Sequence, residues 1–224
     1  MGHIKEQEAN LAIAKLVEEK LKAAGANVIR LKTESETYVT AQRASYARQY
    51  NPDLFLAIHC NSAGEDAKGA EAYYFTPFSQ PLADSISKRV GAYLGSSVHG
   101  TGSLDRGENY NYFFVTQQQD FPSVLIECGF VTNYTEAMAL ANPTHQNGIA
   151  SAIVQGASDF LARCDYSCYG EGSGSFTNSG SYDSTPTESS TSENTAEEVP
   201  SETTPSETPE ENDTLLYCLV MRWP

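Results

Sequence analysis

The sequence predicts an α/β fold of three layers, in which a mostly parallel sheet is flanked by helices. Two segments, residues 53–59 and 123–128, are almost continuously apolar, as expected for strands that are buried on both faces. Around them lie segments whose apolar residues recur at helical spacing. Strands that alternate with helices in this way are typical of layered α/β domains.

The first elements can be justified in chain order. Residues 6–24 carry apolar side chains at helical period with Lys and Glu on the other face, and Gly25 is a suitable C-cap. Residues 27–31 (NVIRL) predict a short strand. Residues 38–50 predict a second helix with alanines on its inner side, which the following Asn-Pro pair ends. The apolar strand 53–59 comes next.

The remaining elements repeat the alternation. Residues 70–75 (AEAYYF) predict a strand, and residues 81–94 predict a helix with one apolar stripe. Residues 106–112 (RGENYNY) are polar and aromatic, so we expect a loop that either lines a binding groove or packs on the surface. The buried strand 123–128 follows. Two helices are expected to complete the domain, over residues 135–142 and 144–162.

The charge distribution divides the chain into three parts. The 224 residues carry a formal net charge of −15, and eleven acidic residues but no Lys or Arg lie between Glu171 and Asp213. This stretch, rich in Ser, Thr, Glu and Pro, cannot bury enough apolar area to fold, so residues 166–213 are expected to form a disordered linker. Residues 1–165 are expected to form the globular domain. Residues 214–224 are a short apolar tail, which is interpreted as the possible start of a truncated module.

Composition also excludes some classes of partner and location. The negative net charge argues against nucleic acid, because phosphates would be repelled. No apolar run approaches 18 residues, so no membrane span is expected. The N-terminal residues lack the apolar region of a signal peptide.

Two polar residues interrupt the apolar strands near their C-terminal ends, where ligand sites collect in α/β sheets. These are His59 and Glu127. A buried carboxylate after Val-Leu-Ile should have a raised pKa, as a general acid or base at neutral pH requires. Glu6, in the first turn of a helix, is explained by the helix dipole when taken alone. Two carboxylates and a His from separate elements nevertheless match the residues of a hydrolytic zinc site. A purely structural role for each remains the alternative.

Four segments resemble one enzyme family. Residues 6–14 (EQEANLAIA) resemble the Glu-x-x-x-Asn-Leu-x-Ile-Ala motif of the zinc-dependent N-acetylmuramoyl-L-alanine amidases of the amidase-3 type. Arg43 stands where that family has an Arg followed by Ala-Asn. Three further motifs are similar in the same order, at residues 53–62 (DLFLAIHCNS), 68–74 (KGAEAYY) and 122–133 (PSVLIECGFVTN).

The resemblance implies a hydrolase of the bacterial cell wall that cleaves the amide between N-acetylmuramic acid and the L-alanine of the stem peptide. Carried over by position, Glu6 and His59 are zinc ligands, and Glu127 is the catalytic carboxylate. The resemblance also implies Zn²⁺ as cofactor, peptidoglycan (muropeptide) as substrate and, for the full-length protein, an extracellular or cell-envelope location.

The chain departs from the family pattern at its start. The family's first strand ends in Asp-Pro-Gly-His-Gly and supplies a zinc-binding His, but no such segment precedes Glu6. We therefore expect an N-terminally incomplete domain that lacks the family's first zinc-binding His, with His3, three residues before Glu6, as the alternative source of a third ligand. Two functions stay open: an active amidase, or an impaired or inactive fragment that acts at most as a cell-wall-binding module. An unrelated zinc peptidase with similar residues is a third alternative.

The remaining cysteines and histidines receive simpler interpretations. Cys60 and Cys128 directly follow His59 and Glu127, and strand alternation predicts that their thiols point to the opposite face and are buried. Zinc ligation by these thiols is the alternative. Outside the strand-end motifs, His99 and His145 are expected to be structural or exposed, and Cys164 and Cys168 could form a local disulfide outside the cell.

Overall fold

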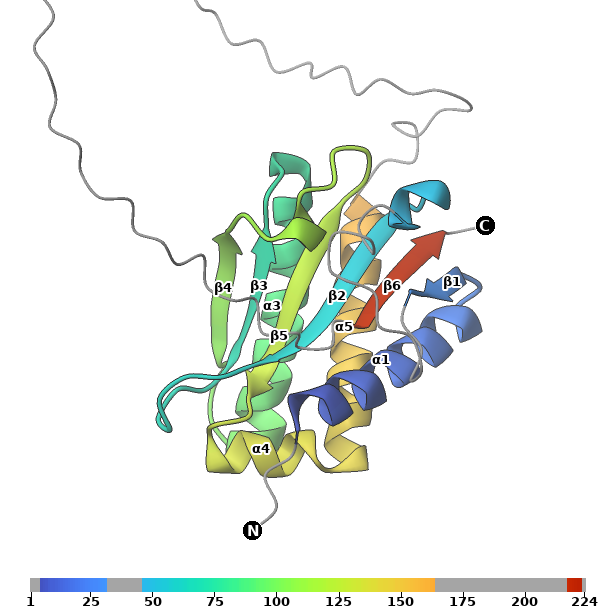
Figure 1. Cartoon of the computed structure of the whole chain (residues 1–224). Helices are drawn as coiled ribbons and strands as arrows, with labels where there is room; N and C mark the ends of the chain where they lie inside the picture. Colours follow the sequence, from blue (N-terminus) through green and yellow to red (C-terminus); the bar gives the residue numbers. More distant parts are fainter. Residues whose placement is uncertain (1–4, 32–45, 164–216, 223–224) are drawn as a thin grey trace, which may run out of the picture. The chain divides into compact units, whose positions relative to one another are not determined.

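The protein is a layered α/β domain built on a six-stranded mixed sheet (Figure 1). The computed structural model describes residues 5–31, 46–163 and 217–222. The strands, in chain order, are β1 Asn27–Arg30, β2 Leu54–Asn61, β3 Ala70–Tyr74, β4 Asp105–Tyr110, β5 Ser123–Phe130 and β6 Tyr217–Arg222. The α-helices are α1 Glu6–Ala23, α3 Gln80–Tyr93, α4 Tyr134–Leu140 and α5 Pro143–Arg163. Short helical segments lie at η1 Pro77–Ser79, η2 Leu94–His99 and η3 Phe114–Thr116.

The strands lie in the order β1-β6-β2-β5-β3-β4. β2 is parallel to β5, and β3 is parallel to β4. β3 is antiparallel to β5, and β6 is antiparallel to both of its neighbours. The sheet is therefore mixed where the sequence suggested a mostly parallel one, because the connections into β3, β5 and β6 each reverse the strand direction.

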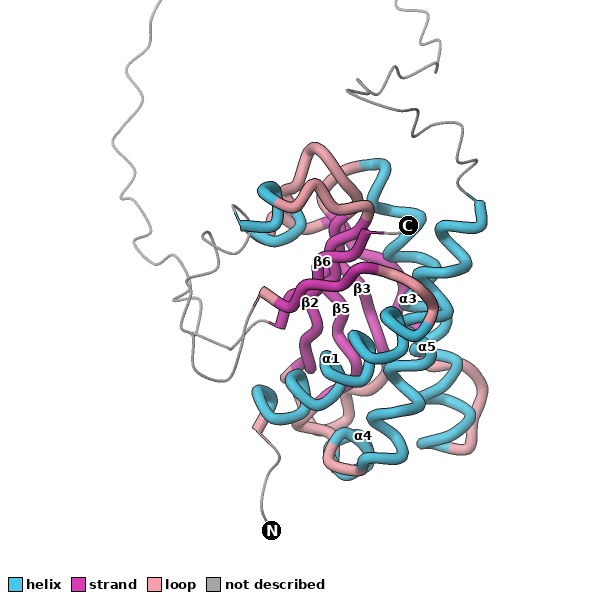
Figure 2. The backbone as a smooth tube through the Cα atoms, turned by 90° about the vertical axis from the view of Figure 1, so that its right-hand side faces the viewer, coloured by secondary structure: helices cyan, strands magenta, loops and turns pink. Residues whose placement is uncertain are grey.

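Three helices cover one face of the sheet. Figure 2 shows α1, α3 and α5 together on the same side of the strands. The main apolar core lies beneath them and joins inward side chains of β2 and β5, such as Leu56 and Ile126, to residues such as Ile13 of α1. Gly156 lets α5 approach α3 closely, since a Cβ there would lie 2.7 Å from the Cα of Ile86.

The opposite face has a second, smaller apolar cluster. It contains Phe55 and Ala57 of β2, Leu125 of β5, and residues such as Val115 and Phe121 from the connection before β5. Because successive strand residues alternate between faces, the next residues of this face along β2 and β5 are His59 and Glu127. The smaller cluster therefore ends where the candidate site begins.

Most of the expected elements that fall on described residues are confirmed, with two differences. Residues 106–112 were expected to form a loop, but β4 covers Asp105–Tyr110 and pairs with β3. Pairing at the sheet edge outweighs the weak strand preference of its Gly, Asn and Asp residues. Most of the helix expected at residues 38–50 lies outside the described residues, although residues 46–49 are helical. The linker expected at residues 166–213 also lies outside them.

The second difference concerns the apolar tail, which the sequence placed outside the globular domain. Residues 217–222 form β6, which pairs with β1 and β2 on either side. Leu219 and Met221 are fully buried in the main core. Asp53 N–H donates to the Met221 carbonyl at 2.8 Å just before β2 begins. The tail is thus an interior strand of this sheet.

No helix among the described residues has the length and apolar character needed to cross a bilayer.

Candidate active site

A row of three polar residues crosses the sheet on the face opposite the helices. In the strand register His59 of β2 faces Glu127 of β5, and Glu127 faces Glu71 of β3. His59 is 8% exposed and Glu71 is 6% exposed. The sequence predicted the first two members of this row. Strand pairing brings them together and adds Glu71 as the third.

Glu6 joins this row from the N-terminal end of α1. Its Oε1 lies 3.3 Å from His59 Nδ1 and accepts hydrogen bonds from Asn10 Nδ2 at 3.1 Å and Cys60 N–H at 3.4 Å. Burial alone would raise the pKa of Glu6, but the bonds from His59 and Asn10, the His59 charge and the Cys60 N–H outweigh it and lower the pKa. Glu6 is therefore a carboxylate held against the imidazole.

Glu127 has the opposite electrostatic environment. Burial, followed by the negative charges of Glu6 and Glu71, raises the pKa of Glu127 to about 8. Its Oε2 atom is buried and has no hydrogen-bond partner among the described residues. A carboxyl group whose pKa lies near neutral pH can both accept and return a proton.

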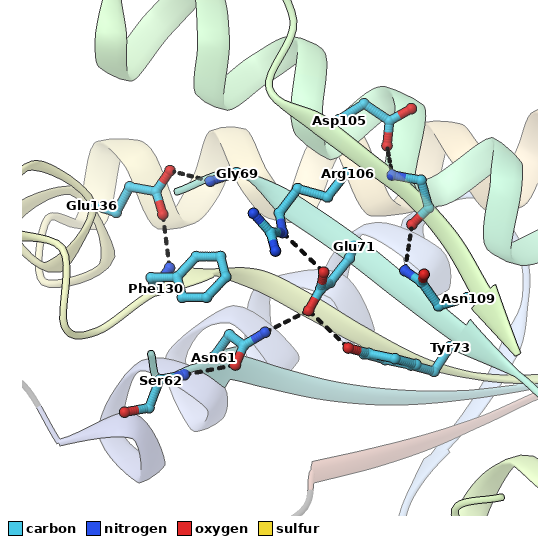
Figure 3. Close-up of polar contacts among 11 residues, drawn as sticks. Asn61, Ser62, Gly69, Glu71, Tyr73, Asp105, Arg106, Asn109, Phe130 and Glu136 are labelled. Atoms are coloured by element: carbon cyan, nitrogen blue, oxygen red, sulfur yellow. Dashed lines mark hydrogen bonds and ion pairs between the residues drawn. The ribbon is translucent and has the colours of Figure 1, made fainter. Parts of the chain in front are cut away.

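Glu71 is a member of this row to which the sequence reasoning gave no role. Its Oε1 accepts hydrogen bonds from Asn61 Nδ2 at 2.6 Å and Tyr73 Oη at 2.8 Å, and its Oε2 accepts one from Arg106 Nε at 2.9 Å (Figure 3). Burial and the bond to Glu71 raise the pKa of Tyr73, so its hydroxyl remains a donor. The available signal was a carboxylate between two alanines in a strand with a buried start.

Glu136 holds the C-terminal end of β5 beside the residue that precedes β3. This fully buried residue of α4 accepts hydrogen bonds from Phe130 N–H at 2.7 Å and Gly69 N–H at 2.8 Å, and lies 3.1 Å from His99 Nε2. Figure 3 shows the two backbone bonds. Asn133 caps the helix by accepting from Glu136 N–H. Between Glu127 and Phe130, Gly129 has φ of 129°, a conformation that favours glycine.

Replacing Glu136 by Ala is expected to destabilise the fold by about 2–5 kcal/mol, because it strands two buried N–H groups and leaves a small cavity. Urea unfolding of the purified chain, followed by far-UV circular dichroism, measures this loss. Glu8→Ala in the exposed first turn of α1 is the matched control, with an expected change within about 0.5 kcal/mol. Equal unfolding midpoints for the two variants would contradict the role of Glu136.

The donor atoms at the site fit a metal ion in part. His59 Nε2 and Glu127 Oε2 are both buried without a hydrogen-bond partner in the part of the chain that the structure describes, which is costly unless a ligand or water binds them. Glu6 and His59 supply a carboxylate and an imidazole side by side. Within residues 5–31, 46–163 and 217–222, however, no group of three His, Cys, Asp or Glu side chains could hold a metal. The third-ligand candidate, His3, lies outside those ranges, as does Arg43.

The two described cysteines next to site residues and His145 do not belong to this row. Cys60 and Cys128 are buried free thiols in the main core, on the face opposite His59, as expected from strand alternation. Burial raises the pKa of both thiols. His145 Nδ1 lies 3.0 Å from Tyr93 Oη. The proposed pairing of Cys164 and Cys168 lies outside the described residues.

Comparison with known sequences points to one family. The profile of the N-acetylmuramoyl-L-alanine amidases (Amidase_3) matches residues 1–159. The chain is 32% identical over 151 residues to the uncharacterized protein YqiI of Bacillus subtilis, covering 67% of this chain and 72% of YqiI. It is 35% identical over 156 residues to the N-acetylmuramoyl-L-alanine amidase LytC of the same species, covering 67% of this chain. The matched region spans only 30% of LytC.

Solved structures agree in fold. The catalytic domain of the N-acetylmuramoyl-L-alanine amidase CwlV from Paenibacillus polymyxa superposes with a TM-score of 0.62 at 30% identity, covering 70% of this chain and 85% of that domain. The CwlD amidase of Clostridioides difficile, solved with the GerS lipoprotein, superposes with a TM-score of 0.58 at 27% identity. It is covered over 86% of its length, against 70% of this chain. The layered α/β fold is therefore confirmed.

Proposed function

Because this chain belongs to the N-acetylmuramoyl-L-alanine amidase family, we propose that it hydrolyses the amide between N-acetylmuramic acid and the L-alanine of the peptidoglycan stem peptide. The observation that carries this proposal is the row of His59, Glu127 and Glu71, with Glu6 against His59. It joins a proton-transferring carboxyl group to a pair of metal-ligand side chains within one open face of the sheet.

Glu127 performs the proton transfers in this proposal. Its Oε2 accepts the proton of the attacking water as the new C–O bond forms at the amide carbonyl. It then returns a proton to the nitrogen of L-alanine as the C–N bond breaks, so the products are a muramic acid carboxylate and a free peptide amine. The raised pKa of Glu127 suits both steps, because the protonated and deprotonated forms are close in free energy near neutral pH.

We assign Glu6 and His59 as ligands of a zinc ion, and His3 as the candidate third ligand. Zinc at such a site supplies Lewis acidity, which lowers the pKa of a bound water and polarises a carbonyl. Glu6 holds the His59 imidazole through its Oε1, and the low pKa of Glu6 keeps it in the form that binds metal.

Hydrolytic activity is expected to fall in proportion to the amount of zinc that is removed from the protein. The purified full chain should contain about one zinc per chain by elemental analysis, and excess chelator should abolish release of peptide from muropeptides. His59→Ala should lose both zinc and activity, whereas His145→Ala, which alters a His in contact with Tyr93, should keep both. Activity that survives complete removal of zinc would contradict the assignment.

Product analysis tests the reaction itself. Mass spectrometry of digested muropeptides should show peptides that begin with free L-alanine and glycan fragments without peptide. Cleavage between two amino acids would instead identify a peptidase. Binding to insoluble peptidoglycan without any product would favour a cell-wall-binding role. The absence of a third metal ligand among the described residues is the observation that favours this second candidate.

We further propose that the protein acts at the cell envelope or outside the cell, where its substrate lies. Supporting this, relatives include a probable cell wall amidase LytH of Staphylococcus saprophyticus, which is 31% identical over 153 residues. The match covers 68% of this chain and 48% of LytH.

A further inference from the structure

Arg106 extends the polar row onto a fourth strand. β4 pairs with β3 through Asp105 opposite Ala70 and Glu108 opposite Ala72, with a shift of register between these pairs. Two residues of β4, Arg106 and Gly107, therefore lie opposite the single residue Glu71 of β3. Such bulges re-aim side chains, and here Gly107 takes φ of 87° while its N–H donates to Asp105 Oδ1 at 2.9 Å. The result is that Arg106 points at Glu71 (Figure 3).

Two contacts fix the Arg106 guanidinium. Its Nε donates to Glu71 Oε2 at 2.9 Å, and its central carbon lies 5.0 Å from the centroid of the Phe130 ring. The Arg106 side chain is nevertheless 43% exposed, whereas that of Glu71 is 8% exposed. The guanidinium is thus anchored through Nε, and its two terminal amino groups, which carry four further N–H donors, have no hydrogen-bond partner among the described residues.

The negative charge of the carboxylates around Arg106 determines which substrate group its guanidinium can bind. Glu6 and Glu71 both place carboxylates at this row, so a substrate that carries a free carboxylate is repelled unless a cation receives it. An arginine fork matches a carboxylate with two parallel hydrogen bonds, and one that is already anchored loses little entropy on binding. In this arrangement the hydrogen bond from Arg106 to Glu71 orients the guanidinium toward the substrate.

We propose that Arg106 binds a free carboxylate in the peptide part of the substrate and so selects the stem peptide. Arg106 reaches from β4 to Glu71 on β3, so its guanidinium lies roughly one strand spacing, about 5 Å, from the strand of Glu127. An extended peptide covers that span in about two residues. The carboxyl group of the L-alanine is itself in a peptide bond, so the recognised carboxylate belongs to the second or third residue of the peptide. This inference rests on the amidase function proposed above.

The test compares two substrates that differ in one group. Two muramoyl peptides of the same sequence are prepared, one with a free carboxylate at the second or third residue and one with a carboxamide there. The full chain is assayed for kcat and KM, and calorimetry in the Glu127→Gln background measures binding without turnover. The variants are Arg106→Gln and Arg106→Lys. Arg89→Gln is the matched control, because Arg89 is similarly exposed and bonds Asp159 through Nε at 2.7 Å, but on the helical layer.

The expected result is a KM and a dissociation constant about 10- to 100-fold lower for the carboxylate peptide than for the carboxamide. Arg106→Gln should abolish that preference with little change in kcat, Arg106→Lys should retain part of it, and Arg89→Gln should retain all of it. Raising the salt concentration should weaken the preference.

Other outcomes overturn the inference or separate it from the function. Equal affinity of the wild-type chain for both peptides overturns it, and so does failure to bind either. An equal fall of kcat on both peptides in Arg106→Gln would also overturn it, since Arg106 would then act only through Glu71. Preferential binding without hydrolysis supports the inference and contradicts the amidase function, whereas hydrolysis without preference does the reverse.

Discussion

Glu127→Gln is expected to lower the rate of muramoyl amide hydrolysis by about two to four orders of magnitude while the chain stays folded. The substitution keeps the shape of the side chain but removes the group that accepts and returns the proton. Release of peptide from muropeptides, followed by chromatography and mass spectrometry, measures this loss. Glu8→Gln makes the same chemical change at an exposed position of α1 and should retain full activity.

The same variant has a readout that does not depend on activity. In the metal-free chain the pKa of Glu127 rises from 4.5 to about 8, chiefly through burial. The folded state therefore binds the proton more tightly than the unfolded state, and its stability falls as the pH rises from 4.5 through 8. Glu127→Gln should remove that fall and be the more stable chain above pH 8. A full rate with Gln at position 127, or the same pH dependence of stability, would contradict the role of this residue.

Leu219→Asp is expected to unfold the domain or to destabilise it by more than about 4 kcal/mol. Leu219 is fully buried, and it pairs with Leu56 of β2 in the strand register. A carboxylate there would be buried without a partner in the middle of the sheet. Thermal and urea unfolding of the full chain, each followed by circular dichroism, measure the effect.

Ile29→Asp is the matched control for Leu219→Asp. Ile29 lies on the adjacent strand β1 with 37% of its surface exposed, so the same introduction of charge should cost about 1 kcal/mol or less. Equal stability of Leu219→Asp and the wild type would show that residues 217–222 do not form an interior strand.

The sequence predicted those parts of the fold whose signal is local. β2 and β5 were predictable because an apolar run buried on both faces is unusual outside a sheet, and His59 and Glu127 stood out as polar breaks in those runs. β6 was not predictable, because Leu219 and Met221 lie in a short apolar segment whose burial becomes clear only from its pairing with β1 and β2. β4 was hidden by residues that disfavour strands and by its position at the sheet edge.

The unpredicted site residues share a different cause. In a strand, a carboxylate such as that of Glu71 suggests a face exposed to solvent. Only the folded structure shows that Glu71 is buried and accepts hydrogen bonds from three donors. Glu136 is an acidic residue in the first turn of a helix, which helix capping explains without any further role. In both cases the function depends on contacts between distant segments, and single-sequence patterns do not encode these.

The position of β6 has a consequence for the order of folding. β6 lies between β1 and β2, yet it follows every other strand in the chain. During synthesis on the ribosome, β1 and β2 must therefore wait with facing edges unpaired until residues 217–222 have emerged. Closing contacts over so long a stretch of chain is slow, so we expect the nascent domain to spend its longest delay before this strand docks.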